Sequence, residues 1–493
     1  MIERAFPQAS RREWVGLGVL TLPCLLYSMD LTVLNLALPH LTADLEPSAA
    51  QQLWIVDIYG FLLAGSLVTM GTLGDRIGRR KLLLIGAAAF GGASTLAAFS
   101  PSAELLIASR ALLGIAGATL APSTLSLIRN MFLDAKERSF AIGVWVASYS
   151  AGAAVGPLIG GALLSRFWWG SVFLVNVPVM LVLLAIGPRL LPEYRDPQAG
   201  RLDLASAALS LGAILAVIYG LKQIAAHGAS PVAAAAIVAG AAVGVTFVRR
   251  QRTLADPLID LGLFARPDFS AALTTYVVCV FTAFGAFLIL AQYLQLVLGM
   301  DPLTAGLWTA PSGVALVVGS MLAPALGRRM RPGRAVAAGF AVATAGFLAL
   351  SQVRLGMGAM MLGWLLLSLG LAPVGTLATD IILAMAPPEK AGAASAISET
   401  GAELGGALGI AVLGSIVTAV YRQGAPPGAD TLGGAVAAAG RLPGPIGAEL
   451  LGAARDAFTH SVEVSAGICA AIAAAAAILS WVVLGRATDG GTS

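Results

Sequence analysis

The sequence predicts an all-α protein that crosses a membrane many times. Of its 493 residues, 58% are apolar and only 11% are charged, far from the averages of soluble domains. A helix needs about 20 mostly apolar residues to cross a hydrocarbon layer about 30 Å thick. Fourteen such stretches occur along the chain, too long and too continuously apolar for barrel strands. We therefore expect a polytopic membrane protein with fourteen transmembrane helices.

The first span follows a basic segment that contains Arg4, Arg11 and Arg12. It has no short apolar region with a small-residue cleavage site, so we interpret it as an uncleaved helix rather than a signal peptide. The later spans are separated by charged or Gly- and Pro-containing segments. The predicted spans are 14–38, 53–73, 82–100, 105–128, 139–164, 169–191, 204–225, 231–248, 269–297, 303–326, 335–353, 357–385, 393–420 and 462–484.

The spans are organised as two groups of six with a pair between them. The loops "GTLGDRIGRRKLL" (71–83) and "GRRMRPGRA" (327–335) are both short, basic and rich in glycine, at corresponding positions of the two groups. They indicate a weak internal repeat. The sequence predicts an N-terminal six-helix bundle in 1–200, an inserted helix pair in 201–250, and a C-terminal six-helix bundle in 251–493.

One segment, 421–461, is long for a loop and lies outside the predicted spans. It contains two Ala-rich runs that favour helix, broken by Pro and Gly. Two interpretations stay open: a solvated connector, and a flap over the outer mouth of the protein.

The basic residues predict the orientation. If the N-terminus is cytoplasmic, most of the 30 Lys and Arg residues fall in the tails and the cytoplasmic loops, which is the usual bias. We therefore expect both termini in the cytoplasm. The net charge of +4 reflects this topology, so it predicts no nucleic-acid partner. The cysteines and histidines have no metal-ligand or CxxC spacing, so no metal site is predicted; these are Cys24, Cys279, Cys469, His40, His227 and His460.

The loop after the second span carries the first motif, "LGDRIGRRK" (73–81). Asp75 is expected to cap the third helix, and the arginines are expected to lie along the cytoplasmic face. A basic loop by itself is also explained by the positive-inside bias. The candidate residues of this motif are Gly74, Asp75, Arg76, Gly78, Arg79 and Arg80.

The fifth span carries the second motif, "GAAVGPLIGG" (152–161). Its glycines recur every four residues and form a flat stripe that lets another helix approach closely. Pro157 removes one backbone donor and permits a bend. Small-residue packing alone explains the stripe, whereas the Gly-Pro pair is more specific. The candidate residues are Gly152, Gly156, Pro157, Gly160 and Gly161.

Five acidic residues lie well inside predicted spans, and among basic residues at this depth only Arg110 opposes them. A charge at the centre of a bilayer costs about 2.5–3.5 kcal/mol or more, so some of these carboxylates must bind protons or a cation. A site that is satisfied by either a proton or an organic cation couples the movements of the two. This is antiport in outline. The five acidic residues are Asp30, Asp57, Asp380, Glu399 and Glu403.

Each of these residues also has a structural interpretation. Asp30 could make a structural hydrogen bond, and Asp57 lies near the outer end of its span, where a carboxylate can be solvated. Asp380 lies near the cytoplasmic end of its span, where it is either solvated or paired with a neighbouring arginine. Arg110 could be the structural partner of an acidic residue.

Glu399 and Glu403 lie one helical turn apart, about 40° from each other around the helix axis. The glycines at 401, 405 and 409 lie on roughly the opposite face. The helix thus has a packing side and a polar side, and the two carboxyl groups are expected to titrate as one unit. We take Glu403 as the better-placed member of the pair. In the alternative, hydrogen bonds to other spans satisfy both carboxyl groups.

Aromatic residues near the span centres and ends could form the apolar, cation-attracting walls of a binding site. For each of them, packing against lipid is an equal alternative. These candidates are Tyr27, Trp54, Tyr59, Trp145, Tyr149, Tyr293 and Trp308.

Taken together, the sequence resembles the major facilitator superfamily over nearly its whole length. The loop 71–83 is similar to the GxLaDrxGrrxxl signature, and span five is similar to the antiporter motif of the drug exporters. The fourteen spans, with "MDLTVLNLALP" (29–39) and "LWIVDIYGF" (53–61), resemble the fourteen-helix drug:proton antiporter branch, especially quaternary-ammonium, dye and biguanide-type biocide exporters. In two places the chain departs from the pattern: "GRRMRPGR" has no acidic residue matching Asp75, and Gly170 stands where relatives carry a bulkier residue.

The resemblance implies two six-helix bundles that rock around a midplane site in the bacterial inner membrane, and a part for Arg110 in proton coupling. The implied partners are protons, lipophilic cations and the lipid bilayer, and we expect a monomer. No GxxxxGK[ST] motif and no constellation of catalytic Ser, His or Cys is visible. We therefore predict a transporter rather than an enzyme, without a cofactor and driven by an ion gradient. Protons are favoured over sodium, and the alternative cargo is a neutral or anionic product such as an antibiotic or siderophore.

Overall fold

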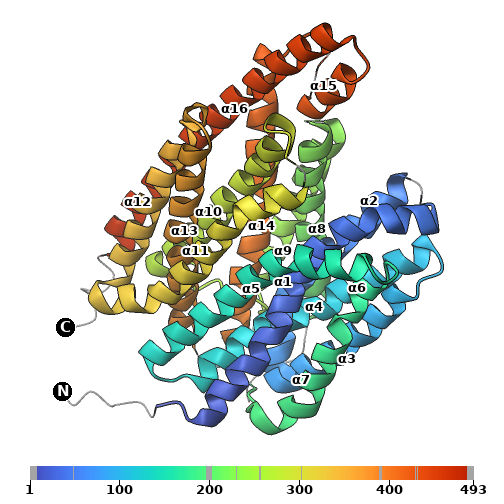
Figure 1. Ribbon diagram of the computed structural model, residues 1–493. Coiled ribbons are helices and arrows are strands. Elements are labelled where there is room, and N and C mark those ends of the chain that lie inside the picture. Colours follow the sequence, from blue (N-terminus) through green and yellow to red (C-terminus); the bar gives the residue numbers. More distant parts are fainter. Residues whose placement is uncertain are drawn as a thin grey trace. The chain divides into compact units, whose positions relative to one another are not determined.

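All regular elements in the described part of the chain are helices, as the sequence predicts (Figure 1). The computed structural model describes residues 8–485 except 48, 196–202, 229, 255–256, 301, 388–390, 428 and 430. The helices of the first half are α1 (Arg11–Leu45), α2 (Ala49–Ile77), α3 (Arg79–Ala98), α4 (Ala103–Met131), α5 (Ala135–Leu164), α6 (Ser171–Leu174), α7 (Asn176–Leu190), α8 (Leu204–His227) and α9 (Pro231–Gln251).

The second half continues with long helices and one short one. Single π-helical turns extend two of the long helices, at Tyr293–Val297 and Ser480–Leu484, and a 3₁₀ turn lies at Val353–Leu355. The helices are α10 (Pro267–Gln292), α11 (Pro302–Arg329), α12 (Pro332–Leu350), α13 (Met357–Met385), α14 (Ala391–Gly424), α15 (Leu432–Ala439) and α16 (Gly444–Leu479).

Twelve helical segments in the described residues are long and apolar enough to cross a membrane. They match twelve of the predicted spans. The other two predicted spans, 14–38 and 139–164, fall in α1 and α5, which are helices of 35 and 30 residues but do not belong to the twelve. The all-α, multi-pass membrane architecture is confirmed, and the count of fourteen spans stays a prediction.

The chain divides into two compact units, and each unit combines three separate segments of the sequence. The C-terminal end of α13 and the N-terminal end of α14 belong to the first unit, whereas the rest of both helices belongs to the second. The boundaries predicted at residues 200 and 250 stay predictions. The first unit holds Met1–Tyr219, Ala235–Leu273 and Thr379–Gly401, and the second holds Gly220–Ala234, Thr274–Ala378 and Ala402–Ser493.

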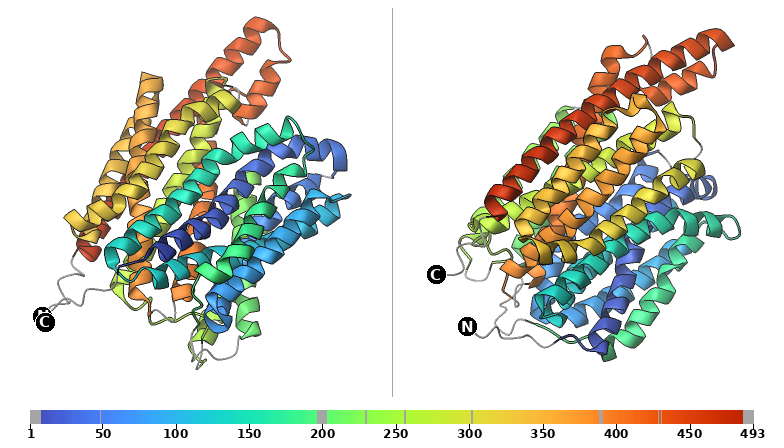
Figure 2. Two further views of the ribbon diagram at one scale, coloured as in Figure 1. Left: turned by 60° about the horizontal axis from the view of Figure 1, so that its bottom comes forward. Right: turned by 60° about the vertical axis from the view of Figure 1, so that its left-hand side comes forward.

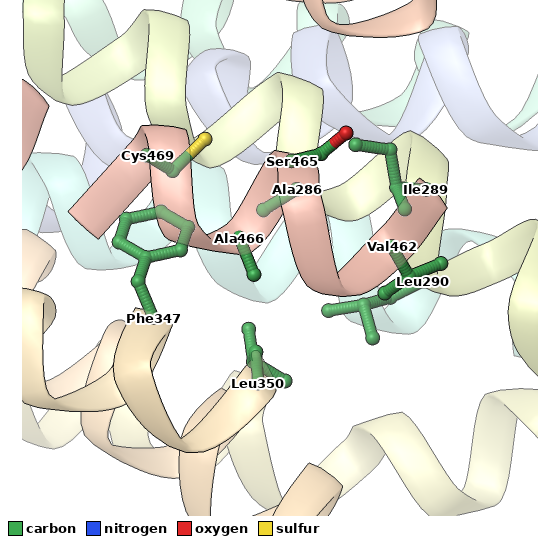
Figure 3. Close-up of a pocket in the computed structure, with 9 residues that line it drawn as sticks. All are labelled: Ala286, Ile289, Leu290, Phe347, Leu350, Val462, Ser465, Ala466 and Cys469. Carbon is green, nitrogen blue, oxygen red and sulfur yellow. The ribbon is translucent and has the colours of Figure 1, made fainter. Parts of the chain in front are cut away.

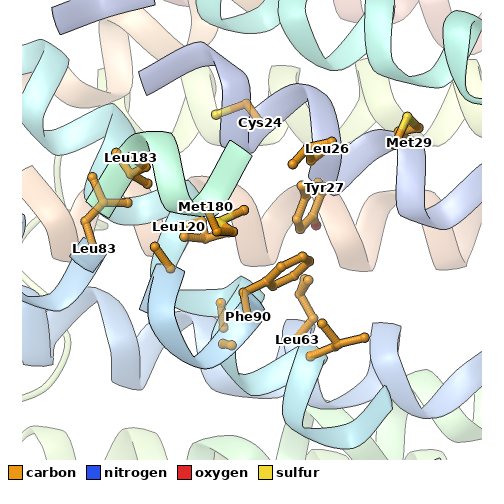
Figure 4. Close-up of a cluster of buried hydrophobic side chains, with 14 of the residues drawn as sticks. Cys24, Leu26, Tyr27, Met29, Leu63, Leu83, Phe90, Leu120, Met180 and Leu183 are labelled. Atoms are coloured by element: carbon orange, nitrogen blue, oxygen red, sulfur yellow. The ribbon is translucent and has the colours of Figure 1, made fainter. Parts of the chain in front are cut away.

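The core of the first unit is formed where α1 packs on α5 and where α4 packs on α2 and α3. Figure 4 shows Tyr27 projecting from α1 into this cluster, which also holds Leu63 and Phe90. Two arginines, Arg79 and Arg110, are among its largest fully buried side chains. Because buried charges need partners, these two arginines mark the places where the first unit is built around ion pairs.

The inserted helices α8 and α9 are joined to each other by a polar network at their ends. Asp203 accepts hydrogen bonds from the Arg250 Nε (2.8 Å), the Ser206 hydroxyl (2.8 Å) and the Ala205 N–H (3.1 Å). The hydrogen bonds from Arg250 and Ser206 lower the pKa of the Asp203 carboxyl to about 2. Since its usual value is about 3.9, Asp203 is ionised at every physiological pH.

This shift predicts how the Asp203 contacts depend on pH. A lowered folded-state pKa adds stability that is complete above about pH 4 and is lost as pH falls through about 2. Asp203→Asn should therefore lower the thermal unfolding midpoint by the same small amount, at most about 2 °C, at pH 8 and at pH 5.5. Thermal unfolding of the purified protein at both pH values checks this. A penalty that grows between pH 8 and pH 5.5 would contradict the assignment.

In the second unit, most of the predicted loop 421–461 is helical. The two Ala-rich runs become α15 and the first part of α16, and Figures 1 and 2 show α15 folded back beside the start of α16. The Thr431 hydroxyl caps α15 by accepting from the Gly434 N–H at 3.1 Å. The last predicted span, 462–484, is therefore the continuation of a helix that begins at Gly444.

Candidate functional site

Asp30 and Arg110 form a buried ion pair between α1 and α4. The Arg110 Nη1 lies 2.9 Å from the Asp30 Oδ2, and the two side chains are only 1% and 4% exposed. The Arg110 Nε donates to the Ile55 carbonyl at 2.9 Å, and the guanidinium lies 4.9 Å from the centre of the Tyr59 ring. Pairing of Arg110 with an acidic residue is confirmed, and its role in proton coupling stays a prediction.

The packing of α4 on α2 brings Arg110 to this place. A Cβ at Gly114 would overlap the Tyr59 carbonyl oxygen, so only glycine permits this approach of the two helices. Arg110 is one turn before Gly114, and Ile55 is one turn before Tyr59. The close crossing at Gly114 therefore puts the Arg110 side chain beside the backbone carbonyls of α2.

Four of the seven predicted aromatic residues form a continuous row in the first unit. The ring centres of Tyr59 and Tyr27 are 6.4 Å apart, those of Tyr27 and Tyr149 are 5.3 Å apart, and those of Tyr149 and Trp145 are 4.7 Å apart. We call these four residues the aromatic row. It begins at Tyr59, beneath the Arg110 guanidinium, and ends at Trp145.

The other three predicted aromatic residues lie elsewhere. Trp54 is 45% exposed and contacts Phe61 with its ring. Tyr293 is buried in the second unit beside Thr459. Trp308 is 43% exposed and lines a small apolar pocket with Met360.

Glu399 and Glu403 both lie within α14. Glu399 is 7% exposed and close enough to Cys24 of α1 for an electrostatic interaction, whereas Glu403 is half-buried. On the glycine face, a Cβ at Gly405 would lie 2.7 Å from the Val277 carbonyl oxygen, and one at Gly409 would overlap the Phe281 carbonyl oxygen. The predicted packing face is therefore confirmed at these two glycines, which press against α10.

The predicted role of Asp75 as the cap of the third helix is wrong. Asp75 lies inside α2, and α3 begins at Arg79 with no side-chain cap on its N-cap residue, Gly78. The Asp75 carboxylate instead accepts from the Arg79 Nε at 2.8 Å and from the N–H of Ala393, in the first turn of α14, at 3.1 Å. It thus accepts a hydrogen bond from one of the N–H groups that have no partner within the first turn of a helix.

Glu193, which the sequence analysis did not identify, binds the first turn of α3. Its carboxylate accepts from the N–H groups of Arg80 (3.1 Å) and Lys81 (3.2 Å). Gly78, with a φ of +112°, lies directly under this carboxylate, where a Cβ would come within 2.6 Å of it. No local signal in the sequence marks Glu193, because its partners are more than 100 residues away. The other motif residues lie around this junction, with Gly74 and Arg76 at the end of α2.

Asp380 is paired rather than solvated. The Arg138 Nε of α5 lies 2.9 Å from its Oδ1, with side-chain exposures of 11% and 17%. The alternative in which Asp380 pairs with an arginine is therefore confirmed. Arg138 was not among the predicted site residues, and it lies 242 positions away in sequence. The Asp57 side chain lies outside the described residues.

The glycine motif of the fifth span makes its tightest contact at Gly152. A Cβ there would overlap the Leu25 carbonyl oxygen of α1, whereas a Cβ at Gly161 would meet nothing within 4 Å. Gly156 and Gly160 are buried, and the Pro157 side chain lies outside the described residues. The stripe is thus a packing surface for α1 at its first glycine.

This contrast predicts the effect of adding one methyl group. Gly152→Ala should destabilise the protein by about 1–3 kcal/mol, because the obstacle is backbone and can move only if α1 shifts. Gly161→Ala is the matched control and should leave the unfolding midpoint unchanged or slightly raised. Thermal unfolding of the two purified variants checks this, and equal midpoints would contradict the described crossing of α1 and α5.

In the second unit, a small pocket lies among α10, α12 and α16, lined by apolar side chains with Ser465 and Cys469 (Figure 3). None of its nine lining residues is charged. An apolar pocket of this kind provides packing space but no group that binds a proton or a cation. The groups that could bind a proton or a cation are therefore the ion pair, the aromatic row and Glu399.

Comparison with known proteins identifies the family. Residues 21–410 match the model of the Major Facilitator Superfamily. The chain is 48% identical to the multidrug efflux pump LfrA of Mycolicibacterium smegmatis over 83% of this chain and 82% of that protein. It is 37% identical to the methyl viologen resistance protein SmvA of Salmonella typhimurium over 83% of each chain.

A third relative is the tetracenomycin C resistance and export protein of Streptomyces glaucescens, 33% identical over 83% of this chain and 76% of that protein. The first of these relatives is an efflux pump and the third an export protein, and the fold of this chain is that of a multi-pass helical membrane protein. The chain belongs to the Major Facilitator Superfamily, as a transporter of its multidrug-efflux type.

Proposed function

We propose that the protein is a proton-coupled antiporter that exports lipophilic cations, such as quaternary ammonium compounds, dyes and biguanide-type biocides, across the bacterial inner membrane. The observation that carries the proposal is the buried Asp30–Arg110 pair, from which the aromatic row leads on to Trp145. A carboxylate supplies the proton site, and aromatic faces attract an organic cation. The groups for proton binding and for cation binding thus lie in one connected part of the first unit.

The Asp30–Arg110 pair supplies a proton switch. When Asp30 binds a proton, it loses its charge, and its attraction for Arg110 falls. Arg110 keeps its other partners, the Ile55 carbonyl and the Tyr59 ring. Because Tyr59 is the first member of the aromatic row, protonation of Asp30 acts on the same residues that would contact the cation.

Glu399 supplies the second acidic group. It lies in the first unit near Cys24, whose Sγ is 3.6 Å from the hydroxyl of Thr124, the residue that accepts the Trp145 indole N–H. A cation held by these rings neutralises a nearby carboxylate, and a proton on the same carboxylate removes that attraction. Exchange of one for the other is antiport.

Two contacts would change when the protein opens toward the cytoplasm: Asp75 with the start of α14, and Arg138 with Asp380 near the end of α13. Each is a single hydrogen-bonded carboxylate contact, so each can form and break with alternating access.

In this proposal both termini lie in the cytoplasm, and the protein acts as a monomer. It uses the proton gradient without a cofactor.

The name of the relative SmvA supports the cationic cargo, because methyl viologen is an aromatic dication. The relative that carries tetracenomycin C in its name favours a second candidate, a proton-coupled exporter of an antibiotic that is not a cation. In that case the carboxylates would transfer protons only. Competition separates the two, since quaternary ammonium compounds should inhibit only a cation exporter.

The purified protein in liposomes tests the proposal. With an imposed pH gradient it should accumulate ethidium, and excess benzalkonium should inhibit this accumulation. A protonophore should abolish transport, whereas a sodium gradient alone should not support it. Ethidium transport that survives the protonophore would overturn proton coupling, and transport that is indifferent to benzalkonium would favour the second candidate.

A further inference from the structure

Thr124 on α4 is the meeting point of three buried polar contacts. Its hydroxyl donates to the Ala121 carbonyl at 3.0 Å and accepts the indole N–H of Trp145 at 3.1 Å. The Cys24 Sγ of α1 lies 3.6 Å from the same oxygen. Thr124, Trp145 and Cys24 are 0%, 2% and 1% exposed. A single hydroxyl therefore connects α1, α4 and α5 in the interior of the first unit.

The contact with Trp145 fixes the orientation of a large ring. A buried indole N–H needs an acceptor, and a hydrogen bond restricts rotation of the side chain. Trp145 is the last member of the aromatic row and lies 4.7 Å from the ring centre of Tyr149, which in turn contacts Tyr27. The position of the Thr124 hydroxyl thus sets the position of one end of the row.

The same end of the row lies beside Cys24, whose Sγ is 3.6 Å from the Thr124 hydroxyl. Cys24 interacts electrostatically with Glu399 and lies beside the side chains of Trp145 and Tyr149. An aromatic wall with a fixed position accepts cations whose size matches the contact surface that its rings offer. A ring that is free to rotate would make that contact surface variable.

We propose that Thr124 is a specificity-determining positioning residue, which holds the Trp145 indole so that the aromatic row selects cations by size. This inference rests on the proposed function. Thr124 itself does not contact the cation and acts through Trp145.

The test compares Thr124→Val, which keeps the shape but removes the hydroxyl, with Thr124→Ser, which keeps the hydroxyl. Transport of slim methyl viologen and of bulky tetraphenylphosphonium is measured in liposomes under a pH gradient. Thr124→Val should change the ratio of the two KM values by about fivefold or more, with kcat changed by less than about twofold. Thr124→Ser should keep the wild-type ratio.

Ser126→Ala is the matched control. Ser126 is also fully buried on α4, two residues further along, and its hydroxyl has no hydrogen-bond partner among the described residues. This variant should keep the wild-type ratio. Trp145→Phe tests the same bond from the other side if Thr124→Val does not fold. It should shift the ratio, and adding a Thr124 substitution should then cause no further shift.

Two results would overturn the inference: an unchanged ratio in both Thr124→Val and Trp145→Phe, or a shift in Thr124→Ser as large as that in Thr124→Val. The failure of the proposed function looks different. If the wild-type protein transports neither cation under a pH gradient, both proposals fall. If it transports both cations but the ratio of the two KM values does not change in the variants, the proposed function stands and the role of Thr124 does not.

Discussion

Replacing Asp30 with Asn should abolish proton-driven dye efflux and also destabilise the protein by up to about 3–5 kcal/mol. Asparagine cannot carry a proton in and out of the site, which removes coupling. It also leaves the buried Arg110 guanidinium, which is only 1% exposed, without its counter-charge. Ethidium efflux from inverted membrane vesicles measures the first effect, and thermal unfolding of the purified protein measures the second.

The double variant Asp30→Asn with Arg110→Gln separates the two effects. Removing both charges leaves no uncompensated ion, so a large part of the lost stability should return. Efflux should not return, because the proton-binding carboxyl is still absent. Full efflux in the single Asp30→Asn variant would show that Asp30 has no part in coupling. An unfolding midpoint equal to that of the wild type would contradict the buried ion pair.

Glu399→Gln and Glu403→Gln should each reduce the initial rate of proton-driven efflux by at least about tenfold. Glutamine has the size of glutamate and keeps the packing of α14 on α10, but it can neither release a proton nor attract a cation by charge. Glu399, at 7% exposure, should show the larger loss, because Glu403 is more accessible to solvent. Efflux of ethidium in matched vesicle preparations measures both variants.

The matched control for this pair is Glu449→Gln, which makes the same change on an exposed side chain of α16, outside the predicted spans. It should leave efflux at the wild-type rate. Wild-type efflux in both α14 variants would remove the two glutamates from the proposed site. A loss in Glu403→Gln alone would restore Glu403 as the better-placed member, as the sequence analysis expected.

Composition and periodicity predict the helices well, because a membrane-spanning helix is specified by about 20 consecutive residues. The predicted span 357–385 coincides with α13, and most other boundaries agree within a few residues. The exception is α16, which begins 18 residues before its predicted span, at Gly444. There the segment before the predicted span is itself helical, so hydropathy does not mark where α16 begins.

The Asp30–Arg110 pair could be anticipated, because Arg110 is the one arginine deep inside a predicted span and it has few acidic residues to meet. The distant partners of Asp75 and Asp380 could not. Asp75 binds Arg79, four residues away, but also the start of α14, 318 residues away, and Asp380 binds Arg138, 242 residues away. Only the packing of the helices brings the distant groups near these carboxylates.

The role of Thr124 shows a further limit of the sequence. A threonine in an apolar span usually satisfies its own hydroxyl by bonding to a carbonyl one turn earlier, as Thr124 does with Ala121. Its second role depends on where Trp145 of α5 lies, which is a property of the crossing of α4 and α5. Residue type and spacing give no sign of that crossing.

The unbroken course of α16 has a practical consequence. Its 36 residues correspond to about 54 Å of α-helix, with no proline after Pro445 in its first turn. A fluorescent or spin label fixed on α15, which packs on α16, would therefore report the tilt of α16. The segment outside the predicted spans is a natural place for a probe, or for a binding antibody fragment, that follows the working cycle without disturbing the buried charges.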